Sequence, residues 1–192
     1  MTNSSNNKEI ITIGIELNHV VRNINKQIIK YYIKEFNLNV DMEDIDEKRV
    51  GAYGGSQGGA LTIACAALEP RIAKAAPQYP FLCDYKRVWE MDLASGAYGE
   101  LKEFFRHFDP RHENEEKWLT KLGYIDLQYL AGRINAEVKM ATGLMDTTCP
   151  PSTQFAAFNK MKCKKSNVIY PDFGHEGLPD WDDIVYNFMR EM

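Results

Sequence analysis

The chain has 192 residues, 26% of them charged, and a formal net charge of −4, which is ordinary for one soluble globular domain. This acidic balance, with no cluster of lysine and arginine against it, excludes nucleic acid as the main expected partner. The polar start Met-Thr-Asn-Ser-Ser-Asn-Asn-Lys has no apolar core of a signal peptide and no run is long enough for a membrane span, so we expect a cytoplasmic protein without a membrane partner.

The first quarter of the chain predicts a strand, a helix and a loop after a polar tail. Residues 1–8 predict a disordered tail, and Glu9–Ile15 places three isoleucines on one face, as in a short strand. Apolar residues recur at near-helical spacing from Val20 to Phe36, which predicts an amphipathic helix. The acidic stretch Asp41–Lys48 predicts a solvated loop.

The segment Arg49–Gly59 carries the most specific pattern in the chain. A β-prone run enters Gly-Gly-Ser-Gln-Gly, with the serine at Ser56, and an apolar, helix-competent segment leaves it. A strand, Gly-x-Ser-x-Gly and a helix form the context of a nucleophile elbow, a sharp turn that exposes the serine hydroxyl. The small residues Gly54 and Gly58 would let strand and helix approach closely, and the helix N-terminus would favour an oxyanion beside Ser56.

The rest of the chain continues the alternation of strands and helices. Three further strands are predicted at Ile72–Pro77, Glu137–Gly143 and Asn167–Tyr170. Four helices are predicted in an aromatic-rich insertion at about 84–132, namely Asp84–Leu93, Gly99–Phe108, Glu113–Leu122 and Asp126–Ala131. Two more are predicted later in the chain, at Pro151–Met161 and Pro179–Met192. This order predicts a single α/β domain over 1–192 with a mostly parallel sheet, right-handed crossovers and helices on both faces.

Three loops at the predicted carboxyl edge of the sheet hold Ser56, Asp146 and His175. The chain order Ser…Asp…His is that of an α/β-hydrolase triad. Ser56 would attack an acyl carbonyl, His175 would take its proton and later protonate the leaving alcohol, and Asp146 would orient the imidazole. The backbone N–H of Gln57 would provide one arm of an oxyanion hole.

Other residues near these loops offer alternative roles. Asp172 is closer to His175 in sequence, but Asp146 follows a strand of its own and approaches from a different loop, so Asp172 is expected to cap a turn. Glu176 is either a partner of His175 or a solvated carboxylate. Cys149 does not lie in a nucleophile elbow, so it is expected to pack in the interior rather than to act as a nucleophile. The four cysteines have no metal-type spacing, so we expect reduced thiols and neither a metal nor a cofactor.

Several motifs in order resemble carbohydrate esterase family seven, the acetyl xylan esterases and cephalosporin C deacetylases. They are Gly-Gly-Ser-Gln-Gly-Gly at the elbow, Gly143–Thr153 with the following Gln-Phe-Ala-Ala-Phe-Asn, and Phe-Gly-His-Glu, while Tyr79–Leu82 and Ile125–Gly132 resemble the family between them. The resemblance implies an α/β-hydrolase fold, a triad of Ser56, Asp146 and His175, and the N–H of Gln57 as an oxyanion donor. It also implies removal of acetyl groups from small acetylated sugars, no metal requirement, a cytoplasmic location and a ring-like homohexamer.

The sequence departs from that family before the elbow. Members carry a long N-terminal half with several strands, an Arg-Gly-Gln motif and a tyrosine that completes the oxyanion hole, and this sequence has none of them. We therefore expect a truncated sheet in which one side of the elbow strand is covered by the strand Glu9–Ile15 alone. Loss of one oxyanion donor typically costs about 10²–10³ in rate.

Three interpretations follow from this pattern. The first is a serine esterase acting on acetyl esters. The second is a catalytically impaired remnant, or one subunit of a split esterase that a separate N-terminal fragment completes. The third is another α/β-hydrolase such as a serine peptidase, because the elbow alone does not select the acyl group.

Overall fold

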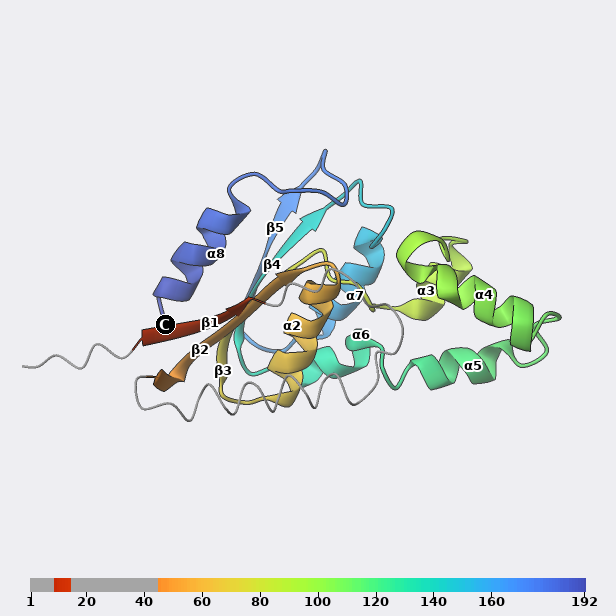
Figure 1. Cartoon of the computed structure of the whole chain (residues 1–192), viewed down its shortest axis with the longest axis horizontal. Coiled ribbons are helices and arrows are strands. Elements are labelled where there is room, and N and C mark those ends of the chain that lie inside the picture. Colours follow the sequence, from red (N-terminus) through yellow and green to blue (C-terminus); the bar gives the residue numbers. More distant parts are fainter. Residues whose placement is uncertain (1–8, 15–44) are drawn as a thin grey trace, which may run out of the picture.

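The structure, a computed structural model, describes residues 9–14 and 45–192 (Figure 1). Five strands lie in these ranges and form one sheet in the order β1-β2-β3-β4-β5, with every pairing parallel. They are β1 Glu9–Gly14, β2 Ile45–Gly55, β3 Ile72–Gln78, β4 Glu137–Gly143 and β5 Lys165–Tyr170. The predicted strands are thus confirmed, whereas the predicted tail 1–8 and helix Val20–Phe36 lie outside the described residues.

Strand β2 begins earlier than the charge pattern predicted. The interpretation of Asp41–Lys48 as a solvated loop is wrong for Ile45–Lys48, which already belongs to β2, and Ile45 is in register with Glu9 of β1. Pairing between parallel strands uses backbone groups, so charged side chains that point to solvent, such as the exposed Lys48, do not prevent it. Strand β1 therefore covers one edge of the elbow strand, as expected of Glu9–Ile15.

The helices fall on both faces of the sheet, as predicted (Figure 1). The spatial order of the strands equals their chain order, and among the described helices α2, α6 and α7 pack on one face of the sheet, whereas α8 folds back over the other. The helices are α2 Gln57–Leu68, α3 Tyr85–Glu90, η1 Gly96–Tyr98, α4 Gly99–Phe108, α5 Glu115–Leu122, α6 Leu127–Leu130, η2 Ala131–Arg133, α7 Pro151–Lys160 and α8 Trp181–Arg190.

Two apolar clusters fill the space between the layers. The larger lies on the α2 side of the sheet, and nearly every residue of α2 is buried in it or beside it. The smaller joins Ala76 of β3 and Ala141 of β4 to Trp181, Val185 and Phe188 on α8. These clusters hold the sheet from both faces, so the loops at its carboxyl edge extend from a rigid support.

The helical segment between β3 and β4 is closed at its base by one buried carboxylate. Asp126 is 3% exposed and accepts hydrogen bonds from the N–H groups of Asp84 and Tyr85 at 2.9 and 3.0 Å. It also accepts from the backbone N–H and side-chain amide of Gln128 at 3.0 and 3.1 Å. The start and end of this segment are therefore held together, and its aromatic helices extend from a defined base.

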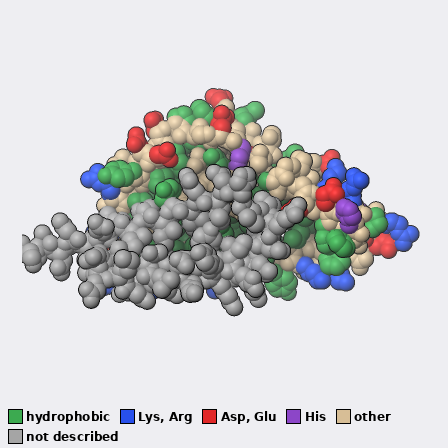
Figure 2. Space-filling model, viewed as in Figure 1, with side chains coloured by type: hydrophobic (Ala, Val, Ile, Leu, Met, Phe, Trp, Pro, Cys, Tyr) green, Lys and Arg blue, Asp and Glu red, His purple; other side chains and the backbone are tan. Residues whose placement is uncertain are grey.

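Charged side chains of both signs are mixed at the α4–α5 end of the molecule (Figure 2). Surface ion pairs occur there, such as Lys86 with Glu116 at 3.1 Å and Arg111 with Glu113. Of the helices that the structure describes, none has both the length and the apolar character that a bilayer span needs.

Candidate active site

The carboxyl ends of neighbouring strands lie side by side at one edge of the sheet. The register pairs Gly55 of β2 with Gln78 of β3, Gln78 with Ala141 of β4, and Gly143 of β4 with Tyr170 of β5. The loops that follow β2, β4 and β5 carry Ser56, Asp146 and His175 respectively. Parallel pairing therefore brings together three loops that are far apart in the chain.

Ser56 occupies a strained turn between β2 and α2. Its φ of 55° with a ψ of −115° is a sparsely populated conformation, which costs an L-residue about 1–3 kcal/mol. Its N–H donates to the carbonyl of Gln78 at 3.0 Å, and its own carbonyl accepts from Phe81 N–H at 3.0 Å. The turn is thus bonded on both sides to the segment that leaves β3, which holds the serine in place.

The elbow glycines allow strand and helix to meet backbone to backbone. A Cβ added to Gly54 would lie only 2.7 Å from the carbonyl carbon of Gly58, closer than real contacts allow. Ser56 is the N-cap residue of α2, yet its side chain forms no capping bond. Its hydroxyl is therefore not engaged by the helix end, and it faces a histidine.

One hydrogen-bonded chain joins the three predicted residues. The Oγ of Ser56 lies 2.9 Å from Nε2 of His175, and Nδ1 of His175 lies 2.9 Å from Oδ2 of Asp146. Because a carboxylate only accepts, Nδ1 carries the proton, and Nε2 is left as the acceptor for the serine hydroxyl. The other oxygen of Asp146 accepts the N–H groups of Thr148 and Cys149 at 2.8 Å each, which fixes the carboxylate.

The side chain of Asp146 is buried, and that of His175 is 24% exposed. An ion pair formed between them would therefore be shielded from water on the carboxylate side, while the imidazole keeps an open edge. Such an arrangement can take a proton from the serine hydroxyl and stabilise the resulting imidazolium.

The alternatives occupy different places. Asp172 is exposed, and Glu176 is exposed with its carboxylate accepting the N–H of Gly174 at 3.0 Å, so it braces its own loop. Of the other histidines, His107 and His112 are exposed, and His19 lies outside the described residues.

Cys149 is buried next to the hydrogen-bonded chain. Its burial and the charge of Asp146 raise the pKa of the thiol far above its usual range, so the sulfur stays protonated. Asp146, Cys149 and His175 offer atoms within 4.8 Å of one another that resemble a metal-ligand set. A metal ion there would need the thiolate and would break the bond between His175 and Asp146, so this donor set fits a metal poorly.

Gln57 is the first residue of α2, and its side chain is half-buried. The first N–H groups of a helix have no acceptor within the helix, and the macrodipole adds a partial positive charge there. The backbone at Gln57 can therefore stabilise a negative oxygen formed beside Ser56.

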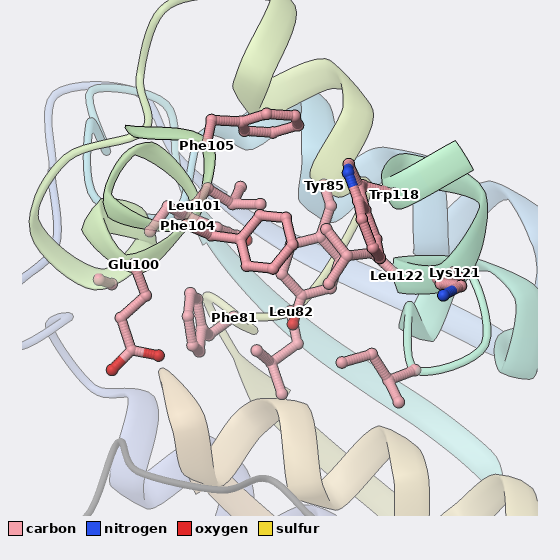
Figure 3. A pocket seen from close by; sticks show the side chains of 13 residues that line it. Phe81, Leu82, Tyr85, Glu100, Leu101, Phe104, Phe105, Trp118, Lys121 and Leu122 are labelled. Atoms are coloured by element: carbon pink, nitrogen blue, oxygen red, sulfur yellow. The ribbon is translucent and has the colours of Figure 1, made fainter. Parts of the chain in front are cut away.

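A cavity of about 470 Å³ opens between the loop after β3 and helices α4 and α5 (Figure 3). Its wall is aromatic and aliphatic, with Glu100 and Lys121 at opposite ends of the group in Figure 3. Phe81 belongs to the wall and also donates its N–H to the carbonyl of Ser56. Neither His175 nor Asp146 lines the cavity, so it neighbours the site without forming it.

The structure adds one residue that the motifs did not single out as functional. The ring of Tyr79 lies 4.4 Å from the imidazole of His175, measured between centroids. Its position directly after β3, at the carboxyl edge of the sheet, is the signal that could have identified it.

Comparison with known proteins supports one family over almost the whole chain. The family model for acetyl xylan esterase (AXE1) matches residues 3–192. Acetyl xylan esterase 1 from Thermoanaerobacterium sp. JW/SL YS485 is 52% identical with a TM-score of 0.83, and the match covers 85% of this chain and 52% of that one. The acetyl xylan esterase from Paenibacillus sp. R4 is 42% identical with a TM-score of 0.82, covering 86% and 52%.

A third relative extends the same pattern. Acetyl esterase Axe7A from Xylanibacter ruminicola is 29% identical over 146 residues, which are 76% of this chain and 31% of that protein. The chain therefore spans about half the length of the two solved esterases and about a third of the Xylanibacter protein.

Proposed function

The chain belongs to the acetyl xylan esterase (AXE1) family, which has an α/β-hydrolase fold, and we propose that it is a serine esterase that hydrolyses acetyl esters of small acetylated sugars. The observation that carries the proposal is the pair of 2.9 Å contacts that connect Ser56, His175 and Asp146. The nucleophile, base and orienting carboxylate of an acyl-transfer enzyme are expected in this arrangement.

In the first half of the proposed reaction, the Oγ of Ser56 attacks the acetyl carbonyl while Nε2 of His175 takes the hydroxyl proton. The carbonyl oxygen becomes negative and accepts the N–H of Gln57. When the tetrahedral intermediate collapses, the bond to the sugar oxygen breaks, and His175 returns its proton to that oxygen. The products of this half are a free sugar hydroxyl and an acetyl ester on Ser56.

In the second half, a water molecule loses a proton to Nε2 of His175 and attacks the acetyl-serine carbonyl. Collapse of the second intermediate breaks the bond to Ser56, whose oxygen recovers the proton, and acetate leaves. Asp146 keeps Nδ1–H in place through both halves and stabilises the imidazolium each time it forms. No metal or cofactor takes part in the proposed cycle.

The choice of acetyl esters is supported by the names of the relatives, two acetyl xylan esterases and an acetyl esterase. We extend it to cephalosporin C deacetylase-like substrates on the same family resemblance. A cytoplasmic location is supported by the four cysteines, which are all free. We also propose a homo-oligomer, a hexamer by resemblance to the family.

A second candidate rests on the length of the match. The chain covers 52% of each solved esterase, and the family resemblance implies a tyrosine that completes the oxyanion hole in a part that this sequence does not match. We therefore propose as the alternative an impaired remnant or one subunit of a split esterase, completed by a separate N-terminal fragment. Loss of one donor predicts activity about 10²–10³ below that of a complete relative.

The deciding experiment uses the purified chain alone. A fluorophosphonate probe should label the wild type and not Ser56→Ala, and p-nitrophenyl acetate turnover should depend on the same residue. Labelling without turnover supports the subunit alternative. If a folded, monodisperse protein shows neither labelling nor turnover, that result contradicts the esterase proposal. Preferential cleavage of peptide substrates over acetylated sugars would favour the serine peptidase interpretation.

A further inference from the structure

We infer that Tyr79 is a positioning residue for His175, and that the face of its ring restrains the imidazole and stabilises its cationic form. The ring centroids are 4.4 Å apart with the planes at 45°. The inference deepens the proposed function and rests on it, because the imidazolium exists only if His175 takes protons. The motif Tyr79–Leu82 carries no assigned role, and no step of the proposed cycle uses the tyrosine.

The backbone of Tyr79 is held by bonds to the strands on either side. Its φ of 30° lies in the left-handed region, which an L-residue adopts only when its surroundings impose it. Its N–H donates to Ala141 of β4 at 2.8 Å. The flanking residues Gln78 and Phe81 bond the N–H and the carbonyl of Ser56, both at 3.0 Å. The turn is therefore joined to the nucleophile's own peptide and to the strand before Asp146.

The ring of Tyr79 is fixed on two further sides. A Cβ added to Gly55 would lie 3.3 Å from Cε2 and 3.6 Å from the hydroxyl oxygen of Tyr79, so the ring crosses the end of the elbow strand. It also packs against the apolar cluster that α8 forms with the sheet. With these contacts the ring has little freedom to move away from His175.

A cation within about 6 Å of an aromatic centroid is attracted to the negative face of the ring. His175 becomes such a cation each time it holds the proton of Ser56. The phenol itself stays neutral, because burial and the nearby Asp146 raise its pKa. The charge on the imidazolium is therefore met by Asp146 on one side and by an uncharged aromatic ring on another.

Other titratable groups also face this centre. Asp146 and Cys149 come from the loop after β4, and Asp182 of α8 acts on the phenol, while the exposed Glu176 on the histidine's own loop accepts the N–H of Gly174. All of them are unchanged when only Tyr79 is replaced. A change in titration between two Tyr79 variants therefore reports the ring.

The test compares Tyr79→Phe, which keeps the ring, with Tyr79→Leu, which keeps an apolar side chain without one. Neither substitute is β-branched, so neither adds strain at the positive φ. Two readouts are measured against pH in the full chain: the rate of fluorophosphonate labelling of Ser56, and the ring nitrogen signals of His175 by NMR. The chain has 4 histidines, so His175→Gln assigns the signal.

Tyr79→Leu should slow labelling about tenfold and move the His175 titration midpoint down by about one pH unit, as loss of one cation–π contact predicts. Tyr79→Phe should stay within about twofold and about 0.2 pH unit of wild type. If Tyr79→Leu is not folded, Tyr79→Met takes its place with the same expectation.

Two results would overturn the inference: wild-type titration and labelling in the variant without a ring, or a loss in Tyr79→Phe as large as that in Tyr79→Leu. A wild-type chain that does not label at Ser56 contradicts the proposed function instead. In that case the NMR midpoint still decides whether the ring stabilises the cation.

Discussion

Gly143 leaves no room for a side chain beside Phe173, because a β-carbon on Gly143 would overlap the carbonyl oxygen of Phe173. Gly143 ends β4, shortly before Asp146, and Phe173 lies two residues before His175. The N–H of Met145 donates to the same carbonyl at 2.9 Å. This contact sets how closely the loop with Asp146 and the loop with His175 approach each other.

Gly143→Ala should therefore separate these two loops without unfolding the sheet. A displacement of about 1 Å between reacting groups costs about 10²-fold in rate, so labelling of Ser56 by a fluorophosphonate should slow by about that factor. Unfolding in urea should still be cooperative. The quantity to measure is the second-order labelling rate of folded protein.

Gly177→Ala is the matched control, because Gly177 lies in the loop of Phe173 and His175 and an added Cβ would meet nothing within 4 Å. Its labelling rate should equal that of wild type. An equal loss in both variants would show that any alanine in this region disturbs the site, and that the Gly143 contact has no special role.

Asp146→Asn should lower Ser56-dependent turnover by about 10⁴-fold, as for the orienting carboxylate of a Ser-His-Asp triad. The Oδ1 of Asp146 accepts two backbone N–H groups, so the amide oxygen of asparagine would take that side and the NH₂ group would face His175. Nδ1 would then have to accept, and Nε2 would carry the proton that blocks attack by Ser56. Initial rates with p-nitrophenyl acetate measure the effect.

The exposed Asp172 provides the comparison for Asp146, since it is nearer to His175 in sequence. Asp172→Asn should keep turnover within about twofold of wild type, as expected of a surface substitution. A larger loss in Asp172→Asn than in Asp146→Asn would reverse the assignment of the orienting carboxylate.

Asp126→Ala should destabilise the domain by about 3 kcal/mol, because it leaves several buried N–H groups without an acceptor. The donors are the backbone N–H groups of Asp84, Tyr85 and Gln128 and the amide of Gln128. The free energy of unfolding from urea titration measures the change, with Asp172→Ala as an exposed control. A change below about 0.5 kcal/mol, the range of surface substitutions, would contradict the closing role of Asp126.

The Cys65 thiol makes stability depend on alkaline pH. Burial in the first place, and the charge of Glu69 in the second, raise its pKa to about 11 in the folded chain. The unfolded thiol ionises near pH 8.5, so the unfolded state loses its proton first, and stability falls between about pH 8.5 and 11 by up to about 1.4 kcal/mol per pH unit. Below pH 8.5 both states are protonated, and this contribution is constant.

Urea titrations of wild type and Cys65→Ala across this pH range, in reducing buffer, isolate the effect. Other buried thiols and phenols lower the stability of both proteins, so the difference between the two curves is the readout. That difference should narrow or change sign as the pH rises from 8.5 to 11. Parallel curves would mean that the thiol ionises equally easily in both states.

Local patterns were sufficient where an element ends at a residue that cannot continue it. The predicted bounds of β4, Glu137–Gly143, and of α4, Gly99–Phe108, agree with the structure at both ends. Asp109-Pro110 closes the helix, because the residue before a proline avoids the helical conformation. The start of β2 at Ile45 has no such local signal, because pairing with β1 extends the strand through an acidic stretch.

The sequence by itself determined which side chains stand at the carboxyl edge of the sheet, because strand periodicity and glycine-rich turns are encoded by near neighbours. It thereby predicted that Ser56, Asp146 and His175 follow three different strands. The sequence also favoured Asp146 over Asp172, but only the tertiary structure decided that Oδ2 of Asp146 lies 2.9 Å from Nδ1 of His175 and that the ring of Tyr79 lies against the imidazole. These relations depend on strand register and on the close approach of Gly143 to Phe173, which involve residues too far apart in the chain for any local pattern to specify.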